Sequence, residues 1–278
     1  MFDLAERAPQ VYYELGIALT LGTPLLLLAP ADAEIPFDVA QNVNRYPPEC
    51  DLDGLLGEQL DVAFYGSQVR GSRASGLAAT LAYAERLAAE HDNVLLGVVL
   101  ESLRRADSDP VRFGDALESV NSYLGHAKLE IVLPCWPGGY PNPAAPSWFA
   151  VMPFRAERET AYEAMRDAAI AAGITPVRGD TAGGQEIIES IWQELCRATH
   201  VTVDLSGFNL NVCLELGIAH TLGRPVLLVG EKGTSQRLAE ALPTVAKWRC
   251  HTYDAAPGSQ ASFRTVVQGF FQNSAPRR

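Results

Sequence analysis

Hydrophobic positions follow two alternating spacings along the second half of the chain. Short apolar runs, typical of buried strands, alternate with segments in which apolar residues recur every three or four positions, as in amphipathic helices. The pattern predicts strands at 147–154, 174–177, 200–205, 225–229 and 248–253, and helices at 157–172, 185–198, 212–222 and the C-terminus. Strands that alternate with helices predict an α/β fold with a doubly wound parallel sheet, which binds ligands at the carboxyl ends of its strands.

The chain also contains an internal repeat. With an offset of 201 residues, Asp3–Leu28 aligns with Asp204–Val229, and 14 of the 26 aligned positions are identical. The best-matched part reads VYYELGIALTLGTPLLLL in the first copy and VCLELGIAHTLGRPVLLV in the second. Two later residues, Pro36 and Tyr46, find their counterparts after a further shift of six. Such long-range similarity indicates two related units, of which the first begins at the middle of the pattern.

The repeat divides the chain into three parts. Residues 1–60 are predicted to be the C-terminal half of one unit, and residues 147–278 a complete second unit. The middle segment, residues 61–146, has the spacing of a βαβαβ run and ends in a Pro- and Gly-rich linker. Three interpretations of it stay open. It supplies the missing front half of the first unit as a circular permutation, it is an unrelated spacer, or the chain lacks upstream sequence.

One stretch requires a test for membrane insertion, because residues 15–31 carry no charge over 17 positions. A membrane-spanning helix needs about 20 apolar residues, and this stretch is interrupted by glycines, threonines and Pro24. The equivalent stretch of the second repeat contains His220 and Arg224. No basic segment precedes residue 15, so a secretory signal is not expected either. The pattern indicates a helix followed by a buried strand, without a membrane partner.

Composition narrows the range of partners. The 33 acidic residues outnumber the 22 basic ones, for a net charge of −11, and no basic patch is evident, which argues against a nucleic-acid partner. The five cysteines are scattered without a CxxC pair or a Cys/His cluster, so neither a disulfide framework nor a metal site is predicted. We expect a cytoplasmic protein without a cofactor.

Three motifs of the second unit occur in a characteristic order: MPF at 152–154, RGD at 178–180 and DLSGFNLNVCLELGIAHTLGRP at 204–225. In this order they resemble the superfamily that joins nucleoside 2-deoxyribosyltransferases and bacterial TIR-like domains. The resemblance covers about residues 147–255 with the complete motif order and residues 3–60 with its second half only. It implies a flavodoxin-like sheet and, in active members, cleavage or transfer at the bond between a ribose and a base. In TIR-like members the substrate is often NAD.

The resemblance places an essential glutamate in the helix after the third strand, and Glu215 of the ELG motif matches that position. Cleavage of an N-glycosidic bond builds an oxocarbenium-like sugar, which a carboxylate can capture or stabilise. The alternative is that Glu215 only forms a salt bridge or a cap. Glu14, with Asp3, forms the equivalent candidate site in the first repeat. That unit lacks a first strand, so we expect Glu14 to contribute less.

Two polar residues lie between the third strand and its helix. Asp204 ends the strand, where a side chain reaches the ligand crevice, so it is a candidate catalytic residue that binds ribose hydroxyls or orients Glu215. The alternative is that Asp204 caps the following loop through Ser206 and Gly207. Asn209 is a candidate substrate-binding residue, although an asparagine here favours capping of the helix.

The remaining candidates end the first two strands of the second unit. The resemblance places Met152, Pro153 and Phe154 beside the base or the sugar, and Phe154 either stacks on a nucleobase or belongs to the core. Arg178 and Asp180 face the ribose, pair with each other, or form an exposed salt bridge.

Three functions remain open at this point. The first is an enzyme that hydrolyses the N-glycosidic bond of a nucleoside or nucleotide, NAD included, or transfers the sugar to another base. The second is a non-catalytic module of the same fold that senses a nucleotide. The third is a scaffold in which the two units pair face to face as a pseudo-dimer. The expected partner is a small-molecule nucleoside or nucleotide, and a homo-oligomer is a further option.

Overall fold

The computed structural model describes residues 1–5, 7–23, 25–35, 43–47, 145–153, 155–178, 187–254 and 261–273, together with five positions between 100 and 116. The middle segment predicted at 61–146 therefore lies almost wholly outside the described residues. Within the described part of the chain, no helix is long and apolar enough to cross a membrane.

The second unit contains a five-stranded parallel sheet. Its strands are β4 (Ser147–Val151), β5 (Thr175–Arg178), β6 (His200–Asp204), β7 (Val226–Glu231) and β8 (Cys250–Tyr253). Their spatial order is β5-β4-β6-β7-β8, which is the 2-1-3-4-5 order of flavodoxin-like folds. The predicted fold class is thereby confirmed. The winding reverses between β4 and β6, so the ligand crevice of this architecture is expected at the carboxyl ends of these two strands.

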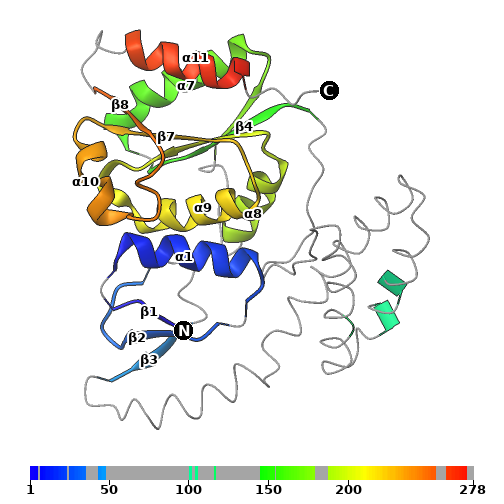
Figure 1. The fold of residues 1–278 in the computed structure, drawn as a ribbon, viewed down its shortest axis with the longest axis vertical. Coiled ribbons are helices and arrows are strands. Elements are labelled where there is room, and N and C mark those ends of the chain that lie inside the picture. The colour runs from blue at the N-terminus through cyan, green and yellow to red at the C-terminus, as the bar shows by residue number, and fades with distance from the viewer. Residues whose placement is uncertain are drawn as a thin grey trace.

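Helices cover both faces of this sheet (Figure 1). They are α7 (Glu159–Ala171), α8 (Ile187–Arg197), α9 (Leu210–Thr221), α10 (Thr234–Ala241) and α11 (Ala261–Asn273), with short 3-10 helices η2 (Ala156–Arg158) and η4 (Ser206–Phe208). Because side chains alternate along a strand, Trp148 and Ala150 of β4 join the core under α7 and α11. Phe149 and Val151 join the core on the opposite face, with α8 and α9.

The first repeat forms a smaller parallel sheet of the same design. Its elements are β1 (Phe2–Asp3), α1 (Pro9–Thr20), β2 (Leu27–Pro30) and β3 (Val43–Tyr46), and the strand order is β1-β2-β3. Phe2 pairs with Leu27, and their counterparts Val203 and Leu228 pair in the same way. The sheet therefore reproduces β6-β7-β8, strand by strand and in register.

The two repeats also agree in backbone detail. Arg7 has a φ of 49° and its counterpart Phe208 a φ of 48°, although residues other than glycine rarely adopt this left-handed conformation. After the helices, Gly22 and Gly223 have φ values of 66° and 65°. The same loop geometry therefore leads into and out of the repeated helix in both copies.

Helix α1 packs directly on α9 through a pair of glycines. A Cβ atom on Gly16 would lie 2.1 Å from the carbonyl oxygen of Leu214, and a Cβ atom on Gly217 would lie 2.1 Å from that of Tyr13. These four residues form two pairs of counterparts at the offset of 201, so the contact is reciprocal, as across a two-fold axis. The two repeats therefore pair face to face within one chain.

A single apolar core joins the two repeats. Leu4, Tyr12 and Leu15 of the first repeat belong to the same cluster of buried side chains as Leu214 and Leu216 of α9. Figure 1 shows the resulting layers, from α7 and α11 through the five-stranded sheet to α8 and α9, then α1, and finally the small sheet. Helix α9 thus lies between its own sheet and α1.

Candidate functional site

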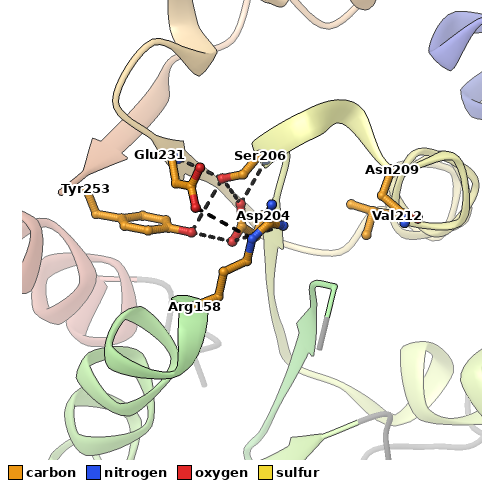
Figure 2. Close-up of polar contacts among 7 residues, drawn as sticks. All are labelled: Arg158, Asp204, Ser206, Asn209, Val212, Glu231 and Tyr253. Carbon is orange, nitrogen blue, oxygen red and sulfur yellow. Dashed lines mark hydrogen bonds and ion pairs between the residues drawn. The ribbon is translucent and has the colours of Figure 1, made fainter. Parts of the chain in front are cut away.

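Asp204 is the centre of a buried polar network at the carboxyl ends of β6, β7 and β8 (Figure 2). Its side chain accepts hydrogen bonds from the backbone N–H of Ser206, at 2.9 Å, and from the Ser206 hydroxyl. The Tyr253 hydroxyl donates to the other carboxylate oxygen at 2.6 Å. Burial and the neighbouring Asp204 carboxylate raise the pKa of Tyr253, so this hydroxyl remains a donor. The network links the last two strands to the loop that precedes α9.

Arg158 of η2 adds a positive charge to this network. Its Nη1 lies 3.9 Å from Asp204 Oδ2, and its Nε lies 3.8 Å from Glu231 Oε1. The guanidinium is buried, and Nη1 has no hydrogen-bond partner among the described residues. At these separations, Arg158 balances the buried carboxylate through its charge rather than through hydrogen bonds. Glu231 also donates its backbone N–H to the Ser206 hydroxyl at 2.7 Å.

The geometry of Asp204 is that of a loop cap. The side chain is 1% exposed, and its acceptor positions are directed at Ser206, Tyr253 and Arg158. Its counterpart Asp3 forms the same short-range contact, because the Ala5 N–H donates to Asp3 Oδ1 at 3.0 Å, but Asp3 is exposed. Both copies therefore use this aspartate to shape the loop, and only the second copy buries it.

Asn209 caps α9. Its side-chain oxygen accepts hydrogen bonds from the backbone N–H groups of Asn211, at 2.9 Å, and Val212, at 3.3 Å, as expected for an asparagine at this position. Figure 2 shows Asn209 and Val212 on the side of the loop away from Tyr253. Asn209 also lines a cavity of about 990 Å³ that opens between the two repeats. Neither Glu215 nor Glu14 lines this cavity.

Glu215 lies on the side of α9 that faces away from α1. Successive residues of an α-helix are rotated by about 100°, so a residue two positions before Gly217 lies roughly 160° from the face that contacts α1. Seven of the twelve residues of α9 are buried, and Glu215 is half-buried among them. On its own side of the molecule, α9 contacts β4 and β6 of the sheet. These are the two strands between which the winding of the sheet reverses.

Glu14 occupies the same position of α1 in a different environment. It is exposed, and its carboxylate accepts a hydrogen bond from Gln10 Nε2 at 2.7 Å. The same Gln10 nitrogen donates to Thr244 of the second unit at 2.6 Å. Because each glutamate precedes its contact glycine by two residues, the two carboxylates point away from each other across the helix pair. The fold therefore does not bring Glu14 and Glu215 into one site.

The other predicted site residues divide between core, surface and undescribed positions. Met152 is buried in the core under α7 and α11, and Pro153 is half-buried at the end of β4. Arg178 donates to both carboxylate oxygens of Glu159 at 3.0 and 3.2 Å, and it lies over the Tyr162 ring. Phe154 and Asp180 lie outside the described residues. Their predicted contacts with a base or a ribose stay predictions.

Neither of the two fully buried cysteines of the described residues is suited to act as a nucleophile. Burial raises the pKa of the Cys196 and Cys213 thiols to about 12, so neither is a ready nucleophile. No cluster of His, Cys, Asp or Glu able to hold a metal ion occurs in the described part of the chain.

The sequence reasoning missed Arg158 and Tyr253 as partners of Asp204. A signal for Tyr253 was available, because it ends β8 at the same edge of the parallel sheet at which Asp204 ends β6. No spacing in the sequence points to Arg158, because η2 only comes near Asp204 through the fold of the loop after β4.

No family model matches the chain, and no curated protein matches it. The relation to nucleoside 2-deoxyribosyltransferases and TIR-like domains therefore stays a prediction from motif order.

Proposed function

We propose that the unit formed by residues 147–278 binds a nucleoside or nucleotide and cleaves or transfers at its N-glycosidic bond, with Glu215 as the reacting carboxylate. The observation that carries this proposal is the placement of Glu215. It is a half-buried acid among the buried apolar residues of α9, in an architecture that binds ligands at the carboxyl ends of its strands.

The chemistry requires a carboxylate in such a place. As the bond to the base breaks, positive charge develops on the sugar, and a nearby carboxylate stabilises that charge or forms a covalent bond to the sugar. Water then completes a hydrolysis, or a second base completes a transfer. In this proposal Asp204 is a positioning residue, because its hydrogen bonds to Ser206 shape the loop that leads into α9.

A second candidate function is binding without chemistry. It is favoured by the burial of Asp204, whose acceptors are directed at groups of the protein itself, and by the absence of Glu215 from the lining of the inter-repeat cavity. In both versions the ligand is a small-molecule nucleoside or nucleotide. A cytoplasmic location belongs to the same proposal, because Cys196, Cys213 and Cys250 are free thiols, as is usual in a reducing compartment.

The test uses chromatography to measure the release of free base from NAD, ribonucleosides and 2′-deoxynucleosides. Each substrate is tried with and without an added acceptor base. Replacement Glu215→Gln is expected to reduce the rate by at least about a hundredfold while the circular dichroism spectrum is unchanged. Glu163→Gln is the matched control, because Glu163 is an exposed glutamate of α7.

Two results would argue against the catalytic proposal. An unchanged rate in a folded Glu215→Gln protein would remove this residue from the chemistry. Saturable binding of a nucleotide by the natural protein, without turnover of any substrate tried, would favour the second candidate function.

A further inference from the structure

The cavity between the two repeats has a balance of charged side chains unlike that of the molecule as a whole. The chain carries a net charge of −11, yet three arginines and only two glutamates line this cavity of about 990 Å³. The arginines come from both repeats, with Arg7 and Arg45 on one side and Arg237 on the other. A volume near 1,000 Å³ lies at the upper end of the range of small-molecule sites.

The three guanidinium groups differ in the contacts that they already make with other groups of the protein. Arg7 forms an ion pair with Glu34 at 2.8 Å. Arg45 donates from Nη1 to the backbone carbonyls of Pro30, Ala31 and Ala33, at 3.3, 3.2 and 2.7 Å. These bonds hold its guanidinium in place through one nitrogen, and its Nε and Nη2 have no hydrogen-bond partner among the described residues. Arg45 is thus a positioned donor without a carboxylate partner among the described residues.

Arg237 of α10 reaches the cavity from the second repeat. Its guanidinium carbon lies 5.6 Å from the centre of the Phe208 ring, and it pairs with no carboxylate in the described part of the chain. Phe208, like Arg237, lines the cavity, and its backbone is left-handed, with a φ of 48°. The ring and the guanidinium together form a wall that is both apolar and positively charged.

Both repeated helices begin at this cavity, since Pro9 and Leu210 line it. The positive ends of their dipoles add to the field of the arginines. Their hydrogen-bond donors contribute less, because Pro9 has no N–H and Asn209 already caps α9. The arginines are therefore the groups that would bind an anion directly.

We infer that this cavity binds a small phosphate ester that also carries hydroxyl groups, such as a sugar phosphate. Arg45 and Arg237 bind the phosphate, since the planar fork of N–H donors on a guanidinium can pair with two phosphate oxygens at once. Glu240, which lines the same cavity without a partner among the described residues, accepts hydrogen bonds from the hydroxyls. The site is separate from Glu215, so this inference does not rest on the proposed function.

Calorimetric titration of the full chain with ribose 5-phosphate, inorganic phosphate and ribose tests the site. We expect saturable binding of ribose 5-phosphate, weaker binding of phosphate, and the weakest binding of ribose. Removal of one charged donor, by Arg237→Gln or Arg45→Gln, is expected to weaken binding of ribose 5-phosphate by about tenfold or more.

The matched control is Arg264→Gln, because Arg264 is an exposed arginine of α11, away from the cavity, with no carboxylate partner among the described residues. Glu215→Gln is expected to bind ribose 5-phosphate normally, which separates this site from the proposed catalytic one. The Arg237 side chain donates to no backbone carbonyl among the described residues, so Arg237→Gln remains informative if Arg45→Gln fails to fold. Absence of saturable binding, equal affinity for ribose, or equal weakening by Arg264→Gln would overturn the inference.

Discussion

Asp204 and Asp3 are the same residue of the repeat in two environments. Both accept a hydrogen bond from the backbone two residues ahead, at 2.9 and 3.0 Å. Only Asp204 is buried, and only Asp204 gains Ser206 Oγ, Tyr253 and Arg158 as further partners. A buried carboxylate stabilises a fold only while its partners remain in place.

Replacement of the buried carboxylate is therefore expected to be costly. Asp204→Asn removes the more buried of the two carboxylates near Arg158 and places an amide N–H₂ near donors, so we expect the free energy of unfolding to fall by about 3 kcal/mol. Asp3→Asn, the matched control at the exposed counterpart, is expected to change it by no more than about 0.5 kcal/mol. Urea denaturation measures both. Equal effects of the two replacements would contradict a structural role for the buried network.

We expect His220 to make the stability of the molecule sensitive to acid. Burial, together with the Lys247 charge, lowers the pKa of His220 to about 4, and the ring accepts or donates a hydrogen bond at Nδ1 with the Tyr13 hydroxyl of α1 at 3.1 Å. In the unfolded chain a histidine has a pKa of about 6.5. Between these two values the unfolded state binds a proton that the folded state does not, so stability rises with pH.

Stability is therefore expected to be complete above about pH 6.5 and to decline as the pH falls toward 4. His220→Leu, which installs the residue of the first repeat at this position, is expected to flatten this decline. Burial also lowers the pKa of His251, so His251 is expected to cause the part of the decline in stability that remains in this variant. Urea denaturation at several pH values between 7 and 4 measures the slope. An unchanged slope in the variant would exclude His220 as a source of the acid sensitivity.

At the scale of elements, the contact between α1 and α9 depends on two glycines. A methyl group on Gly16 or Gly217 would meet a backbone carbonyl oxygen at 2.1 Å, and a backbone cannot rotate away as a side chain does. We expect Gly16→Ala and Gly217→Ala each to lower the free energy of unfolding by about 2 kcal/mol or more. The matched control is Gly269→Ala in α11, where the nearest atom would be 3.9 Å away. There, we expect a gain of about 0.5–1 kcal/mol.

The elements of the second unit were largely predictable because their hydrophobic spacing is regular. The strand predicted at 200–205 corresponds to β6, and the helix predicted at 212–222 corresponds to α9, with ends that differ by one or two residues. Helix α10 was missed because its eight residues, TSQRLAEA, are mostly polar and short for a helical pattern. The face-to-face pairing of the repeats was only one of several options. A glycine within the ELG motif is compatible with close packing of its helix against another segment, but the sequence does not show which segment that is.

At the scale of the whole molecule, the shared core predicts that the two repeats unfold together. All four tryptophans, at positions 136, 148, 192 and 248, lie outside the first repeat. Their fluorescence therefore reports on the rest of the chain. Gly16→Ala in the first repeat is expected to shift the fluorescence transition and the circular dichroism transition by the same amount. A fluorescence midpoint that does not move would show that the repeats fold independently.

The site was less predictable than the fold. The sequence predicted Asp204 at the end of a strand and Asn209 before the next helix, and both are there. Asp204 shapes the loop after β6, and Asn209 caps α9. The partners Arg158 and Tyr253 become neighbours only when η2 and β8 meet at one edge of the sheet. The arginine-lined cavity was also beyond prediction, because it is formed by the packing of one repeat on the other.

The most direct measurement compares the two repeated glutamates in one assay. Both stand in the same ELG motif, but Glu215 is half-buried and Glu14 is exposed. We expect Glu215→Gln to lower the rate of base release by at least about a hundredfold and Glu14→Gln to change it by no more than about twofold. Equal losses in two folded variants would contradict the account, because they would show that the repeats share one composite site.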